Sequence, residues 1–111
     1  MKLNSKLPIQ AGAIITGKNE YYVSSSTCVK LSNNYIISFT IGTQETYTQN
    51  TLKNIGSSTV KPPYLKYGIA LVMSGNVVLG IASIYLDQNG ELFLNANFTA
   101  NFLVINCFLM I

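Results

Sequence analysis

The stretch from residue 67 to residue 95, YGIALVMSGNVVLGIASIYLDQNGELFLN, constrains the fold of this chain more than any other. It is apolar, rich in β-branched residues, and interrupted twice by turn-favouring residues, Ser74-Gly75-Asn76 and Asp87-Gln88-Asn89-Gly90. Such turns between apolar segments predict three successive antiparallel strands, a meander. In the second turn, we expect Asp87 to cap its own backbone and Gly90 to adopt the left-handed conformation of a following bulge. A ribbon this apolar must be covered by the rest of the chain or by other copies of it.

The first part of this stretch also has an alternative interpretation. Residues 67–86 carry no charge, and their number is about what a helix needs to cross a bilayer. Ser74-Gly75-Asn76 would then place a polar, helix-weakening break at the membrane midplane, and Gly80 and the β-branched residues also disfavour a helix. The sequence therefore favours the meander, with a membrane-spanning helix at 67–86 as the alternative.

The shortage of charge in the whole chain predicts assembly with other copies. Charged residues make up 10% of the 111 residues and hydrophobic residues 49%, whereas about 25% of an ordinary globular chain is charged. A chain of this size leaves roughly a third of its extended-chain surface exposed. Much of that surface must be uncharged, and such surfaces are usually buried further in an oligomer. We therefore expect a homo-oligomer.

The residue types present argue against several classes of function. The chain has no His, which excludes Ser-His and Cys-His nucleophiles. Of its four acids only Asp87 and Glu91 flank one turn, which is weak support for the carboxyl pair of a glycosidase. Seven scattered lysines without Arg do not form a nucleic-acid-binding stripe. We expect no enzyme activity, no cofactor and no metal site. Cys28 and Cys107 are either two buried small hydrophobic residues or, if their strands are neighbours, a disulfide.

The remaining segments predict a single all-β domain at 11–111, preceded by a lead-in segment or linker at 1–10. We expect a hairpin turn at Ser32-Asn33-Asn34, a loop at Ser24-Ser25-Ser26, and an extended loop or edge at Pro62-Pro63. Further strands are expected at 11–16, 20–23, 28–31, 35–41, at the sheet edge over 46–52, and within 98–111.

The last segment differs from the others because both of its faces are apolar from Phe102 onward. A strand of this kind lies in the middle of a sandwich or at an oligomer axis. With seven to nine short strands and no credible long helix, the fold class is an antiparallel β-sandwich or jelly-roll-like knob, which we expect to be trimeric.

The second half of the chain carries a recognisable order of motifs: Ile55-Gly56, Lys61-Pro62-Pro63-Tyr64, a glycine-containing strand, Val77–Leu86, the turn at 87–90, Glu91-Leu92-Phe93-Leu94 and a final apolar strand. This order resembles the C-terminal head domains of phage tail-fibre and baseplate receptor-binding proteins. The segment NYIISFTI at 34–41 looks like the strand that leads into it, so the resemblance covers roughly residues 28–111. The family commonly has a Leu-Pro step and an Arg before the proline, where this chain has Ile55-Gly56 and Lys61.

The resemblance implies a homotrimeric receptor-binding knob at the tip of a virion tail, assembled in the host cytoplasm. Such a knob attaches to host cell-surface carbohydrate without catalysing a reaction. Its partners would be its own copies, a host cell-surface glycan and other tail or baseplate proteins, with no nucleic acid and no membrane insertion. The alternative is a purely structural trimerisation or fibre-tip capping module without a ligand.

Candidate ligand-binding residues are the aromatic and amide side chains of the polar segments. They are Tyr47, Gln49 and Asn50 in the polar middle of the chain, and Tyr64 and Tyr67 beside the prolines. Aromatic faces pack on the C–H surfaces of sugars, while amides and carboxylates hydrogen-bond sugar hydroxyls. For each tyrosine the competing interpretation is that it covers a sheet edge or a subunit boundary. The loop Val60–Tyr67 is the first place to expect binding, because loops held by a rigid sheet tend to carry it.

Overall fold

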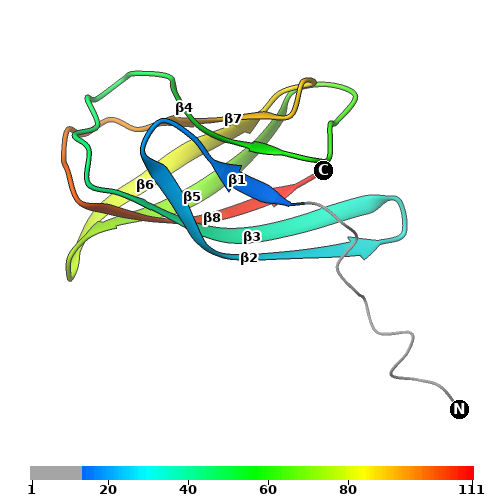
Figure 1. The fold of residues 1–111 in the computed structure, drawn as a ribbon, viewed down its shortest axis with the longest axis horizontal. Coiled ribbons are helices and arrows are strands. Elements are labelled where there is room, and N and C mark those ends of the chain that lie inside the picture. Colours follow the sequence, from blue (N-terminus) through cyan, green and yellow to red (C-terminus); the bar gives the residue numbers. More distant parts are fainter. Residues whose placement is uncertain (1–13) are drawn as a thin grey trace, which may run out of the picture.

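A computed structural model of the protein describes residues 14–111 (Figure 1). The predicted lead-in segment at 1–10 lies outside the described residues. Within the described part, eight strands are β1 (Ile15–Gly17), β2 (Tyr21–Leu31), β3 (Asn34–Thr43), β4 (Lys53–Ser58), β5 (Lys66–Ser74), β6 (Val77–Leu86), β7 (Glu91–Asn95) and β8 (Leu103–Met110). The prediction of an all-β antiparallel fold is confirmed.

All eight strands belong to one antiparallel sheet with the order β1-β4-β7-β6-β5-β8-β3-β2. The sheet folds over on itself, so that β4 and β7 face β2 and β3 across the interior, as in a sandwich (Figure 1). Its two end strands, β1 and β2, lie against each other, which leaves the sheet nearly closed. Register shifts at Val23/Ser25, Asn54/Gly56 and Val72/Met73 contribute to this curvature, because a β-bulge bends and twists its strand.

The predicted meander is confirmed. Strands β5, β6 and β7 are successive neighbours, and Gly75 and Asn76 form the two-residue connection between the first two. Asp87 Oδ1 accepts hydrogen bonds from the backbone N–H groups of Asn89 and Glu91, both at 2.9 Å, and Gly90 has φ of +80°. Residues 67–86 are therefore two strands. No helix in the described part of the chain is long and apolar enough to cross a membrane.

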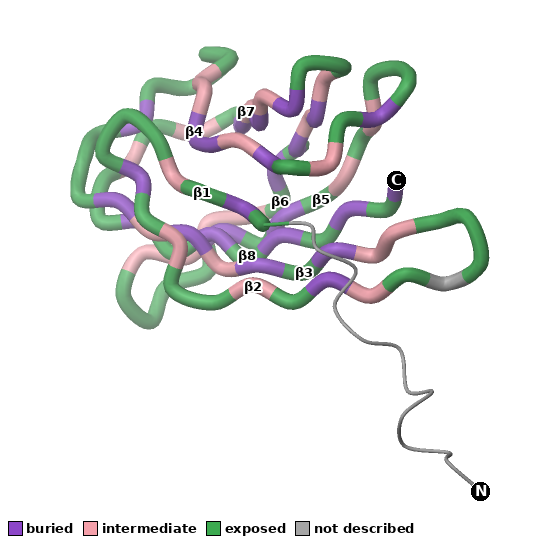
Figure 2. The backbone as a smooth tube through the Cα atoms, turned by 45° about the vertical axis from the view of Figure 1, so that its right-hand side comes forward, coloured by how far each residue is buried: buried purple, intermediate pink, exposed green. Residues whose placement is uncertain are grey.

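The hydrophobic core fills the inside of the curved sheet. Along β8 every second residue points inward and is buried, and Figure 2 shows buried residues alternating with exposed ones along β8 and mostly with intermediate ones along β3. The inward residues of the other strands join the same cluster, among them Ile37, Ile84 and Leu94, each fully buried. Burying a side chain of this size contributes about 1.5–3 kcal/mol to folding relative to leaving it exposed.

The two cysteines are free and buried, so the disulfide alternative is wrong and the buried hydrophobic interpretation is confirmed. Cys28 pairs in register with Ile37 and Cys107 with Phe39, which places β3 between the strands of the two thiols. Burial also raises the pKa of the Cys107 thiol far above its usual value. The neutral thiol is therefore the stable form of Cys107, and it packs as a small hydrophobic residue.

Three strand predictions need correction. Residues 21–31 form one strand instead of two, because the expected loop Ser24–Ser26 is carried on β2 by the bulge at Val23/Ser25. The expected edge strand at 46–52 is wrong, since this segment makes only a bridge between Tyr47 and Ala100. The strand of the polar middle is instead β4, KNIGSS, which pairs with β1 and β7 through its backbone and fully buries the side chain of Ile55.

Candidate functional site

Three aromatic side chains from adjacent strands lie in one row on the outside of the sheet. Tyr67 of β5 pairs in register with Tyr85 of β6, which pairs with Phe93 of β7. The rings of Tyr67 and Tyr85 pack edge to face, with their centroids 5.3 Å apart and an interplanar angle of 78°. This arrangement is favourable for aromatic pairs, and it holds the exposed Tyr67 ring in place.

This row forms the floor of a shallow depression of about 610 Å³, which we call the aromatic pocket. The pocket is lined by Leu52, Leu65, Tyr67, Tyr85, Asp87, Phe93 and Asn95. Besides the hydroxyl groups of Tyr67 and Tyr85, its polar side-chain groups are the carboxylate of Asp87 and the amide of Asn95. Both backbone hydrogen bonds to Asp87 go to Oδ1, so the turn fixes the carboxylate while Oδ2 has no partner within residues 14–111.

The loop predicted to carry binding borders this pocket. The Gln88 side chain donates a hydrogen bond to the Pro63 carbonyl oxygen, which ties the loop Val60–Tyr67 to the turn that carries Asp87. Lys66 Nζ lies 4.2 Å from the centroid of the exposed Tyr64 ring, a cation–π contact. Of the candidate residues predicted from sequence, Tyr67 lines the pocket and Tyr64 lies three residues away in the chain, outside its lining.

Tyr47, by contrast, is buried, with 1% of its surface exposed. Its Oη donates to the Thr51 carbonyl at 2.6 Å and accepts from the Ala96 backbone N–H at 2.8 Å. The side chain therefore fastens the segment before β4 to the segment after β7, and its ring is closed to a ligand. Gln49 and Asn50 are exposed, and their backbone N–H groups bind Thr99 Oγ1 and the Ala96 carbonyl. None of these three residues lines the aromatic pocket.

Sequence reasoning missed Tyr85, Phe93 and Asn95 as members of the pocket. The missing signal was the register of the second hairpin. Once Leu86 and Leu92 are paired across the turn at 87–90, Tyr85 and Phe93 become cross-strand neighbours on the opposite face from the leucines.

A second depression, of about 490 Å³, lies where β2 and β3 meet the segment after β3. Its lining is polar and acidic and includes Glu20, Tyr22, Thr43 and Glu45. Tyr22 donates a hydrogen bond to Glu20 Oε1 at 2.8 Å, and this bond raises the pKa of the Tyr22 hydroxyl. No group of three or more His, Cys, Asp or Glu side chains suited to a metal ion occurs among residues 14–111.

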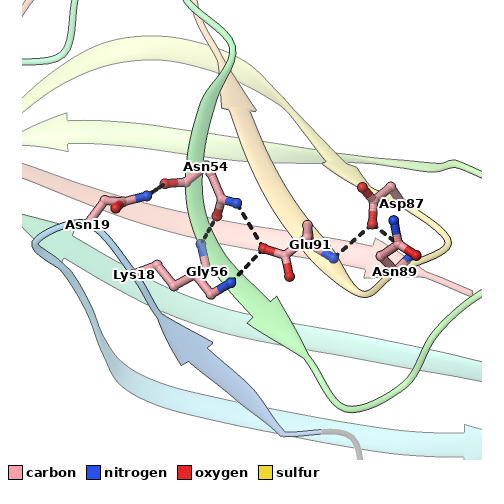
Figure 3. A network of polar contacts seen from close by, with 7 residues as sticks. All are labelled: Lys18, Asn19, Asn54, Gly56, Asp87, Asn89 and Glu91. Carbon is pink, nitrogen blue, oxygen red and sulfur yellow. Dashed lines mark hydrogen bonds and ion pairs between the residues drawn. The ribbon is translucent and has the colours of Figure 1, made fainter.

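A polar network stands where β1, β4 and β7 meet, close to the turn of the aromatic pocket (Figure 3). Glu91 Oε1 accepts from Lys18 Nζ at 2.7 Å and from Asn54 Nδ2 at 2.8 Å. Asn54 in turn accepts from the Gly56 N–H, and its carbonyl accepts from the Asn19 amide. The connection between β1 and β2 is thus pinned to β4 and β7 by polar contacts, which supports the near closure of the sheet.

The same network makes stability depend on pH. The hydrogen bond from Lys18, followed by that from Asn54, lowers the pKa of Glu91 below its usual 4.5. A carboxyl whose pKa is lowered by folding stabilises the protein above its unfolded pKa, and this contribution is lost as the pH falls through the folded pKa. We expect Glu91→Gln to cost less than about 1 kcal/mol near pH 7, because the ion pair is partly exposed.

At a pH below the folded pKa of Glu91, where the carboxyl is protonated in both the folded and the unfolded chain, wild type and Glu91→Gln should unfold at nearly the same urea concentration. Urea denaturation at one chain concentration and both pH values measures this convergence. If the urea midpoints of wild type and Glu91→Gln differed by the same amount at both pH values, Glu91 would act only through its size and shape.

Comparison with known proteins gives no relative for this chain. No protein-family model, curated protein or solved structure matches it.

Proposed function

We propose that this domain is a non-enzymatic attachment domain that binds cell-surface carbohydrate through the aromatic pocket. The single observation that supports this is the row of Tyr67, Tyr85 and Phe93 on adjacent strands, with the Asp87 carboxylate and the Asn95 amide at its border. The rings offer apolar faces for the C–H surface of a sugar, and the carboxylate and amide can accept and donate hydrogen bonds to its hydroxyl groups.

The shape of the pocket suits the end of a glycan rather than a small buried cofactor. It is open and shallow, whereas small-molecule pockets enclose most of the surface of their ligand. An open site of this kind binds weakly, so several copies held in one particle are needed to give useful avidity. The proposed setting that fits both requirements is the one implied by the resemblance, an oligomeric receptor-binding head at the tip of a phage tail.

A glycan array probed with the purified chain, followed by calorimetric titration of a glycan that binds, tests the proposal. Tyr67→Ala removes the exposed ring and should weaken binding about tenfold or more, as expected for an aromatic contact at the centre of a site. Asn95→Ala should weaken it by a smaller factor, because it removes hydrogen bonds and leaves the rings in place.

The matched control is Tyr22→Ala, since Tyr22 is 64% exposed and Tyr67 is 67% exposed, but Tyr22 lies outside the aromatic pocket. This variant should bind the glycan as the wild type does. Equal loss of binding in both tyrosine variants would contradict the proposed site, and the absence of any glycan ligand would contradict the function.

A structural assembly module without a ligand is the second candidate function. The observation that favours it is the uncharged outer surface of β5, β6 and β8, which is argued below. Under this alternative, the chain would assemble into oligomers, and no glycan on the array would bind.

A further inference from the structure

Most outward side chains of β5, β6 and β8 are large, apolar and exposed. We call this surface the outer apolar face and define it by Ile69, Leu71, Ile81, Val104, Phe108 and Met110. Each of these residues is between 39% and 62% exposed. The cause is the alternation of the strands, which on β8 buries Ile105 and Cys107 and turns Val104 and Phe108 outward.

The register of the sheet makes this surface continuous. Ile69 of β5 pairs with Phe108 of β8, and Leu71 of β5 pairs with Ile81 of β6. Cross-strand neighbours have Cβ atoms about 5 Å apart, so these side chains adjoin one another. Two outward positions between these side chains are polar but uncharged, namely Ser83 and Asn106.

An antiparallel sheet with one face in water usually places polar side chains on that face. Here the inner face holds the core and the outer face is apolar as well, which is what the doubly apolar pattern of the last segment indicated. Within residues 14–111 the outer side of β8 is not covered, although β8 lies between β5 and β3 in the sheet. Burial inside a single sandwich therefore does not explain the pattern, and the oligomer interpretation remains.

The area of the face approaches what a stable contact needs. With Val78 at its end, and without Tyr67, which belongs to the aromatic pocket, it exposes about 600 Å² of apolar side chains, taking ~150–200 Å² for each fully exposed one. The largest apolar patch on a typical monomer is about 300–600 Å², and a specific interface buries about 800 Å² on each partner.

The charge pattern identifies the occupant. The chain carries a formal charge of +3, but none of its charged residues belongs to the outer apolar face. A second copy offers an equally large apolar surface, and bringing two such faces together buries no charge and opposes no like charges. Sheets pack face to face at about 10 Å by interdigitating side chains of this kind.

We infer that the outer apolar face packs against the same face of another copy of this chain. The contact gives a dimer if it is two-fold, or a trimer if three copies turn the face toward a common axis. The inference stands apart from the proposed glycan site, because a chain that assembles without binding any glycan would leave it intact.

Light scattering after size-exclusion chromatography of the full chain tests the inference. The wild type at about 50 μM should have a mass of two or three times 12.1 kDa. Ile69→Lys places a charge in the middle of the face and should reduce the mass to that of a single chain, because a buried unpaired charge costs several kcal/mol.

The matched control is Ile14→Lys, since Ile14 and Ile69 are 60% and 59% exposed, and Ile14 lies beside β1 on another part of the molecule. This variant should keep the wild-type mass. Ser83→Lys is the second test. Ser83 is exposed and pairs with Ile69, so the substitution charges the face without removing an apolar side chain from the single chain.

A monomeric wild type would overturn the inference, as would an equal loss of mass in Ile14→Lys and Ile69→Lys. A monomer in which Phe108 is nevertheless protected from oxidation would assign the face to residues 1–13 of the same chain, and would also overturn it.

Discussion

Gly17→Ala is expected to destabilise the fold by about 3 kcal/mol, the upper end of the usual cost of overpacking and a large part of the 5–15 kcal/mol that holds a typical domain together. A Cβ atom at residue 17 would lie 1.9 Å from the Tyr21 carbonyl oxygen and 3.1 Å from the Tyr22 Cα. Both contacts are with backbone, so no side-chain rotation relieves them. Gly17 ends β1 where the chain turns into β2, and its missing side chain lets the two ends of the sheet approach.

Gly42→Ala is the control for this prediction. A Cβ atom there would come no closer than 3.4 Å to its neighbours, so the change should stay within about 1 kcal/mol. Urea denaturation of both variants at one chain concentration compares them with the wild type. Equal stability of the two variants would mean that β1 and β2 are not held together at residue 17.

Tyr47→Phe is expected to cost about 2 kcal/mol, even though it removes a single oxygen atom. That oxygen accepts from the Ala96 N–H and donates to the Thr51 carbonyl, and both Tyr47 and Ala96 are buried. Without it the Ala96 donor is left unsatisfied in the interior, which costs about 1–3 kcal/mol. Tyr47→Ala should cost more, about 3–5 kcal/mol, because it also leaves a cavity.

Tyr64→Phe is the matched control, since Tyr64 is 60% exposed. Its melting temperature and unfolding free energy should equal those of the wild type. If Tyr47→Phe behaves like Tyr64→Phe, then the buried hydroxyl does not hold the two segments together. If Tyr47→Phe instead impairs glycan binding at full stability, then the original expectation of a ligand role for Tyr47 is correct.

The parts of the fold that were predictable are those whose signals are local. The meander at 67–95 combines apolar strands with turn residues whose chemistry is short-range, such as the cap that Asp87 gives to its own turn. Strand β4 was missed because KNIGSS has no apolar alternation, and its pairing with β1 and β7 depends on backbone groups that any sequence carries. A single strand at 21–31 was missed because a bulge lets three serines continue it.

In the candidate site, too, the residue with a local sequence signal was predicted, and those that depend on pairing between strands were not. Tyr67 was expected from its place beside a proline loop. Its partners Tyr85 and Phe93 come from other strands, and they are brought together only by the register across two strand pairs. The residues next to Tyr47 in the sequence are polar, and this pattern predicts an exposed side chain that could bind a ligand. Its burial depends on segments about 50 residues later, around Ala96 and Ala100.

We expect copies of this domain to pack against one another through the outer apolar face, while the neighbouring aromatic pocket stays accessible to a ligand. Hydroxyl-radical footprinting of the full chain at about 50 μM, read by mass spectrometry, tests it most directly. In a single chain Phe108 and Met110 are 45% and 50% exposed, and Tyr67 is 67% exposed. We predict that Phe108 and Met110 are protected from oxidation while Tyr22, 64% exposed, and the Tyr67 ring stay reactive. Oxidation of Phe108 and Met110 in proportion to their single-chain exposure would contradict the account.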